Sequence, residues 1–140
     1  MGAVDTTEVL IANSQFGGGA TTWAPATWFL GLSTTTPATD GSGFTEPVGG
    51  SYARPSITNN ATNFPTATTS AGTTTKSNGT AFTFANPTGT WGLITHFGFF
   101  TASSGGLPAY WFKLDAAITV NNGNTPVQFD IGQLIMTWGA

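Results

Sequence analysis

The chain has 140 residues, of which 39% are hydrophobic and 6% charged, with no cysteine and a net charge of −3. This length predicts one domain with a sizeable core. Three basic residues cannot form the positive surface that nucleic acids require. No apolar run approaches the length of a membrane-spanning helix, which is about 18 residues. The absence of cysteine excludes disulfide and thiolate chemistry.

The chain is rich in Thr, Ser, Gly and Asn, a composition that is also typical of disorder. Its 11 phenylalanines and 5 tryptophans, however, supply enough apolar surface to fold. So few charges give little electrostatic repulsion between molecules, which is a liability for a free, concentrated protein. The composition therefore favours a component of an assembly, covered by its neighbours, over a cytosolic enzyme.

The N-terminal segment "DTTEVLIANSQFGGG" predicts a short helix or an ordered arm. Asp5 or Thr6 could cap the helix, and the three glycines after Phe16 would end it. Val9, Ala12 and Phe16 fall at helical spacing and form a partial apolar stripe.

From Pro25 onward the chain predicts short β-strands separated by turns. The strand-like runs are "TWFLGLST", "SYARPSITN", "TAFTFAN" and "TWGLITHFGFFTA". Between them, "TTPATDGSGFTEPVGG" reads as a loop and "FPTATTSAGTTTKSNG" as a polar edge or connector. Pro55 favours an edge position for "SYARPSITN" because proline cannot donate to a sheet ladder.

The C-terminal third has the clearest alternation. From Tyr110 to Val120 every second residue is apolar, which predicts a half-buried strand. After the turn "NNGN", the segment "PVQFDIG" predicts three inward residues, Val127, Phe129 and Ile131. At Gly132 the parity changes, which implies a turn or bulge. The inward residues that follow are Leu134, Met136 and Trp138.

About eight short strands with Gly/Pro turns and no helical stretches between them predict an all-β fold, an antiparallel β-sandwich or jelly roll. Residues 1–20 are expected to form the N-terminal arm or short helix. Residues 21–140 are expected to form a single β-sandwich domain.

His96, the only histidine, lies in "TWGLITHFGFFTASSGG". Counting in twos places it on one face with Ile94 and Gly98, where the glycine would leave open space. The imidazole is either a base or ligand in that gap, or it fills the gap and hydrogen-bonds to a neighbouring strand. A metal site needs several ligands and a catalytic triad needs a nucleophile and an acid. No such motif is present, so we favour packing and expect no catalytic residue, metal ligand or cofactor.

The acidic residues offer two further candidate sites. Asp115 and Asp130 could converge as paired carboxylates, although outward positions on strands favour a solubilising role. Asp40 and Glu46 lie in a Gly-rich loop and could bind calcium, but their spacing matches no EF-hand. The only arginine, Arg54, either anchors a carboxylate such as Asp115 or Glu46 or contacts a partner. The tryptophans could stack on sugar rings, or belong to the core or a subunit interface.

Several irregular motifs occur in a characteristic order: "LIANSQFGGG", "TWFLGLSTTTPATDG", "TEPVGGSYAR", "WGLITHFGFFTASSGG" and a C-terminal alternating hairpin pair. In these motifs the chain resembles a family of short tailed-bacteriophage structural proteins, commonly labelled tail fibre proteins. The resemblance covers nearly the whole chain except residues 61–79, and the chain departs from the family's pattern at Pro55 and Thr101. It implies a structural role in the virion and assigns no catalytic residue.

The leading hypothesis is a capsid decoration (cement) protein on the capsid surface that binds the major capsid protein lattice. The alternative is a tail-fibre or tail-tip component that binds host glycans. In either role we expect partners among the capsid or tail proteins, and a homo-oligomer such as a trimer. The residues expected at the partner interface are Val9, Leu10, Ile11, Phe16, Trp23, Phe44, Tyr52 and Arg54.

Overall fold

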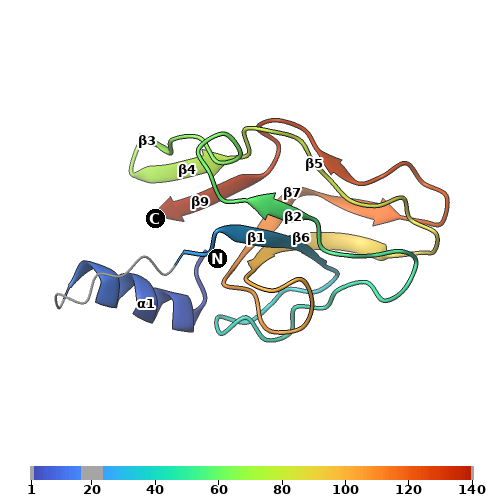
Figure 1. Ribbon diagram of the computed structural model, residues 1–140, viewed down its shortest axis with the longest axis horizontal. Coiled ribbons are helices and arrows are strands. Elements are labelled where there is room, and N and C mark those ends of the chain that lie inside the picture. The colour runs from blue at the N-terminus through green and yellow to red at the C-terminus, as the bar shows by residue number, and fades with distance from the viewer. Residues whose placement is uncertain (1, 17–23, 140) are drawn as a thin grey trace.

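The computed structural model describes residues 2–16 and 24–139, which form one helix and nine β-strands (Figure 1). The helix α1 spans Asp5–Gln15. The strands are β1 Thr27–Ser33, β2 Ser56–Thr58, β3 Thr68–Ser70, β4 Thr73–Ser77, β5 Phe82–Thr83, β6 Gly92–Phe100, β7 Tyr110–Val120, β8 Gln128–Phe129 and β9 Ile135–Gly139. This arrangement confirms the predicted all-β sandwich with a short N-terminal helix. The predicted boundary between residues 20 and 21 lies outside the described residues. Within the described residues, no helix has the length and apolar character needed to cross a membrane.

The strands form two layers. One layer is a four-stranded antiparallel sheet in the order β2-β1-β6-β7. The other contains the three-stranded sheet β3-β4-β9 and the two-stranded sheet β5-β8, and Figure 1 shows β3, β4, β9 and β5 above β1 and β6. The short strand β2 follows Pro55 and lies at a sheet edge, as predicted.

The main core lies between the layers, and strand register determines which side chains enter it. Leu30 pairs with Phe99 and Leu32 with Phe97, and all four are buried. Across the next strand pair, the rings of Phe97 and Phe112 stack with centroids 5.5 Å apart. Of the positions predicted to face inward in the C-terminal third, the following are buried: Phe112, Leu114, Val120, Leu134 and Met136. The prediction is wrong for Ala116, which is exposed because it lies where β7 departs from the register of β6.

The opposite face of the four-stranded sheet is also covered, because Gly31 pairs with Gly98 and leaves room for rings. A methyl group on Gly98 would lie 2.7 Å from Phe44, and one on Gly31 would lie 2.7 Å from Phe100. The sequence predicted open space beside His96, which is wrong, because the ring of Phe44 from the loop after β1 occupies it.

Two other expectations for side-chain direction are wrong. Ile131 is 71% exposed, because β8 ends at Phe129 and Ile131 belongs to the turn in which Gly132 adopts φ +81°. Ile94 and His96 do not share a face, because the register between β6 and β7 shifts between them. Alternation counted along a single strand does not reveal such an irregularity.

The strand β7 forms one edge of the four-stranded sheet. At its start the Trp111 N–H donates to the Gly2 carbonyl, and the Val4 N–H donates to the carbonyl of the preceding Ala109. Farther along, Ile118 lies opposite Ile94 and Lys113 lies opposite His96, so residues 114–117 form a wide bulge.

The helix α1 is attached to the sandwich mainly through its first turn. Val4 is its N-cap residue and provides no side-chain cap, so the prediction of Asp5 or Thr6 as the cap is wrong. The attachment comes from burial of Val4 and Thr7 and from the Asp5 N–H, which donates to the Thr39 carbonyl at 3.2 Å. Figure 1 shows the rest of α1 extending away from the sandwich.

Candidate functional site

His96 is 5% exposed and lies on the sheet face opposite the main core. Its ring meets Trp111 edge-on with centroids 5.5 Å apart, and its Nδ1 lies 2.7 Å from the Thr95 hydroxyl. Burial lowers the pKa of His96, and the nearby charge of Lys113 lowers it further. The side chain is therefore a neutral packing group, bonded to its own strand and not to a neighbouring one.

The acidic residues of the candidate sites are either exposed or hydrogen-bonded to near neighbours in sequence or, for Glu46, to Arg54. Asp115 and Asp130 are exposed, and Asp130 accepts a 2.6 Å hydrogen bond from the Gln128 amide. Asp40 accepts hydrogen bonds from the Ser42 hydroxyl and N–H, which lower the pKa of Asp40 and close a local turn. In the part of the chain that the structure describes, no three His, Cys, Asp or Glu residues gather to hold a metal ion.

Arg54 is buried and forms an internal ion pair with Glu46. Its Nε and Nη2 donate to the two carboxylate oxygens of Glu46 at 2.8 and 2.7 Å. Its Nη1 donates to the carbonyls of Ala102 and Gly105, and its Cζ lies 3.4 Å from the ring centroid of Phe100. Of the two predicted roles for Arg54, anchoring a carboxylate or contacting a partner, the structure shows the first, with Glu46 as the carboxylate.

Tyr52 completes this cluster. Its hydroxyl donates to Glu46 at 2.7 Å and accepts from the Leu32 N–H of β1 at 2.9 Å. Burial raises the pKa of Tyr52 well above its ordinary value. Arg54, Glu46 and Tyr52 together fix the loops at residues 46–54 and 102–105 onto the sheet. Phe44, another expected interface residue, is half-buried over Gly98.

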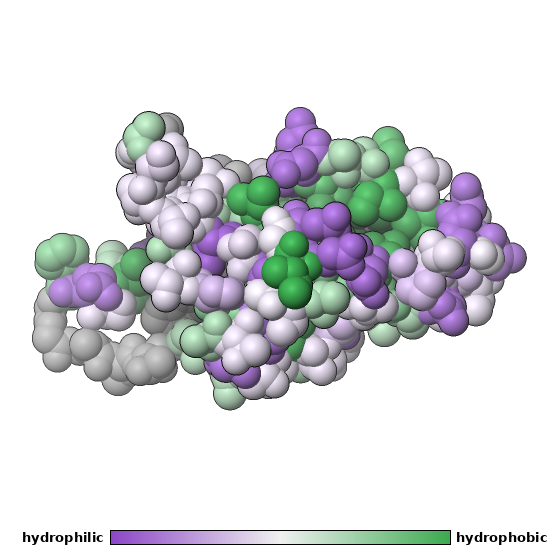
Figure 2. All heavy atoms as spheres, turned by 90° about the horizontal axis from the view of Figure 1, so that it is seen from above, coloured by the Kyte–Doolittle hydropathy of each residue, from purple (hydrophilic) through white to green (hydrophobic). Residues whose placement is uncertain are grey.

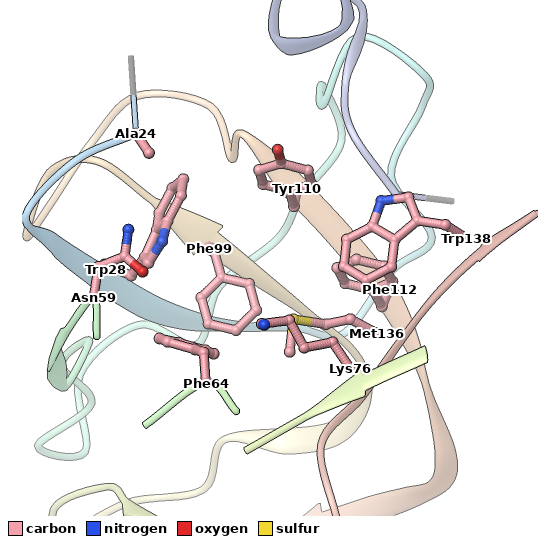
Figure 3. A pocket seen from close by; sticks show the side chains of 10 residues that line it. All are labelled: Ala24, Trp28, Asn59, Phe64, Lys76, Phe99, Tyr110, Phe112, Met136 and Trp138. Atoms are coloured by element: carbon pink, nitrogen blue, oxygen red, sulfur yellow. The ribbon is translucent and has the colours of Figure 1, made fainter. Parts of the chain in front are cut away.

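An apolar pocket of about 180 Å³ opens between the two layers (Figure 3). Its polar side chains are already engaged, since Lys76 Nζ donates to the Pro65 carbonyl at 2.6 Å and Asn59 Nδ2 to the Pro25 carbonyl at 2.9 Å. The pocket therefore suits an apolar group. It is lined by Ala24, Trp28, Asn59, Phe64, Lys76, Phe99, Tyr110, Phe112, Met136 and Trp138.

The tryptophans are mainly packing residues. Trp28, Trp91 and Trp111 are each at most 8% exposed, and Trp138 is half-buried against Phe112. The indole nitrogens of Trp91 and Trp111 donate to the carbonyls of Gly50 and Ala38. Trp23 lies outside the described residues. Among the described tryptophans, Trp28 and Trp138 also line the apolar pocket.

The most exposed apolar side chains of the expected interface lie on and after α1. Val9 is 59% exposed, Leu10 46% and Phe16 81%, whereas Ile11 is half-buried. The predicted stripe of Val9, Ala12 and Phe16 therefore faces solvent. Figure 2 shows this part of the chain beside the sandwich, where hydrophobic side chains reach the surface.

The sequence carries no signal for this pocket. Phe64 belongs to the segment predicted as a polar connector, and Met136 is one of the residues predicted to face inward. The pocket brings together side chains from β1, β4, β6, β7 and β9, which are remote in sequence. A strand pattern carries no signal for such a convergence.

Comparison with known proteins identifies the family. No curated protein matches the chain. The model of one protein family, described as "Podophage GP4 fiber I protein gp80", matches residues 2–137 and confirms the resemblance to phage fibre proteins. Because the match covers nearly the whole chain, the protein belongs to this family of podophage fibre proteins and is a structural protein of the virion.

Proposed function

We propose that the chain is a fibre component of the tail, held on other virion proteins by apolar contacts. The observation that carries this proposal is the match of residues 2–137 to a phage fibre family. With 6% charged residues, the protein has little means of docking by charge. We assign it no catalytic role, since His96 is a buried packing group.

The surface that we propose for docking is the outward side of α1. An isolated helix of 11 residues is marginal in water, so α1 gains stability from a partner that covers it. Full burial of Val9, Leu10 and Phe16 would contribute about 1.5–3 kcal/mol each before the cost of association. Phe44, Tyr52 and Arg54 contribute indirectly, by holding the loops that shape the sandwich.

Localisation on the virion tests this proposal. Gold-labelled antibodies against the purified domain should decorate the tail of intact virions, and a cryo-electron microscopy map should show the sandwich there. As a matched control, antibody against the major capsid protein should label the heads of the same virions. Labelling confined to the head would contradict the fibre assignment.

Capsid decoration is a second candidate, supported by one feature of the fold. All described strands belong to one sandwich, and no elongated stalk extends from the described residues. A compact domain with few charges suits docking on the major capsid protein lattice, including as a trimer. The protein should then bind tail-less heads, and deletion of residues 2–16 should reduce its retention. Absence of binding to heads would exclude this role.

Binding of host glycans by the isolated domain receives less support. The aromatic rings of the apolar pocket form its walls, and the side chains of Lys76 and Asn59 are bonded to backbone carbonyls. We therefore expect a glycan array to remain blank. Specific binding that is lost on changing Trp138 to Ala would contradict this expectation and assign the pocket to receptor recognition.

A further inference from the structure

We infer that Phe16 at the end of α1 inserts into the apolar pocket of a second copy of the chain. This inference rests on the docking role proposed for α1 and names the partner. The site would be incomplete in one copy, because the ring and the pocket come from different molecules.

The inserted group is the phenyl ring of Phe16. Phe16 is 81% exposed, so it does not occupy the pocket of its own chain. It follows the last residue of α1, and Val9 lies seven residues earlier on the same side of the helix, about 10 Å along the axis. Two apolar contacts at that separation would orient the helix as well as anchor it.

The pocket matches this ring in size and polarity. Its volume is about 180 Å³, and apolar cavities of about 150 Å³ are large enough to hold benzene. Figure 3 shows the rings of Trp28, Tyr110 and Trp138 arranged around that of Phe99. An entering phenyl ring could therefore make the edge-to-face contacts that aromatic rings prefer.

The electrostatics do not oppose the contact. Lys76 is the charged residue of the pocket lining, whereas α1 carries Asp5 and Glu8 and has no basic residue in its last turn. Asp5 and Glu8 lie in the first turn, at the opposite end of the helix from Phe16, so they would neither repel Lys76 nor add more than a small attraction across solvent.

The arm and the pocket lie at the same end of the molecule, which favours a closed assembly. The chain enters α1 after Val4, and Ala24 lines the pocket. Gly2 also lies there, since a methyl group on it would be 3.3 Å from Trp138 Nε1. Two copies facing each other at this end can exchange arms reciprocally, and such self-complementary contacts close without exposing a further pocket.

Disulfide trapping between two differently sized chains tests the inference, because the chain contains no cysteine. An enlarged, tagged Gln15→Cys chain is mixed with an untagged Asn59→Cys chain and oxidised mildly. Gln15 is exposed beside Phe16, and Asn59 is exposed at the pocket. We expect a disulfide-linked heterodimer, which can form only between copies. Addition of Phe16→Ala to the tagged chain should lower the yield about tenfold or more.

The matched control replaces Asn59→Cys with Val48→Cys, because Val48 is 95% exposed and does not line the pocket. Equal yields with the two cysteines would overturn the inference, as would a Gln15→Cys/Asn59→Cys double variant that forms only an internal disulfide. Sedimentation equilibrium provides a second measurement, in which Phe16→Ala should weaken self-association about tenfold or more and Val48→Ala should not. These assays use purified protein, so their failure would leave the location on the virion to be decided separately.

Discussion

Replacement of Glu46 with Gln isolates the contribution of the buried ion pair. Glutamine has nearly the same shape as glutamate, but it is neutral and presents an NH₂ group where Glu46 presents an oxygen. The carboxylate now accepts three hydrogen bonds, two from Arg54 and one from Tyr52. In the variant the guanidinium stays buried with two backbone carbonyls and the ring of Phe100, and without a counter-charge.

The expected loss of unfolding free energy is about 3 kcal/mol. Removal of one partner from a buried ion pair costs about 3–5 kcal/mol, because the other charge remains desolvated. The Arg54 side chain is 3% exposed and the Glu46 side chain 24%, so water can partly replace the lost carboxylate. This partial access places the cost at the lower end of the range.

Urea unfolding followed by tryptophan fluorescence measures the effect. At typical m-values the midpoint should fall by roughly 1–3 M. Glu8→Gln is the matched control, since Glu8 is exposed in the first turn of α1 and its replacement should change stability by less than about 0.5 kcal/mol.

The double variant Glu46→Gln/Arg54→Met then tests the cause. If an uncompensated charge produces the loss, removal of that charge should recover part of the stability. A loss below about 1 kcal/mol in Glu46→Gln, or a double variant less stable than the single one, would refute the reasoning.

Four further predictions concern single side chains. The pKa of His96 is lowered in the folded protein, so just below the ordinary value of 6.5 the unfolded chain binds a proton that the folded chain does not. Stability should therefore fall as the pH drops below about 7, and His96→Gln should reduce that fall in urea titrations. Burial raises the pKa of Tyr110 to about 12, so stability should be lost as the pH rises from 10 towards 12, and tyrosinate absorbance should appear together with unfolding. Asn78→Asp should cost about 3 kcal/mol or more in urea unfolding, because the amide donates to three carbonyls that a carboxylate would repel. Gly98→Ala should cost about 1–3 kcal/mol by the same measurement, since its methyl group would lie 2.7 Å from the ring of Phe44; unchanged stability would show that the ring moves freely.

The sequence predicted the features that depend on local pattern. Alternation along β7 correctly identified Phe112 and Leu114 as inward residues, and the parity change at Gly132 correctly indicated a turn. Pro55 indicated an edge because its missing N–H affects any sheet in the same way. These signals lie within a few residues of the feature that they predict.

Features that depend on a distant segment could not be predicted. Arg54 had Asp115 and Glu46 as possible partners, and only the path of the loop over the sheet selects Glu46. Spacing assigned Val9 and Phe16 to one helical face, but spacing does not tell whether that face meets the sandwich or solvent. The sequence likewise gave no sign that Phe44 would fill the space beside His96.

The edge strand β7 has a consequence for how many molecules can join. A long, regular edge would let further chains add their strands without limit, as in fibrils. Here residues 114–117 bulge out of register, and Lys113 and Asp115 project from the same stretch as exposed charges. Both features obstruct strand-to-strand growth. The four-stranded sheet is therefore a poor template for open-ended polymerisation through β7.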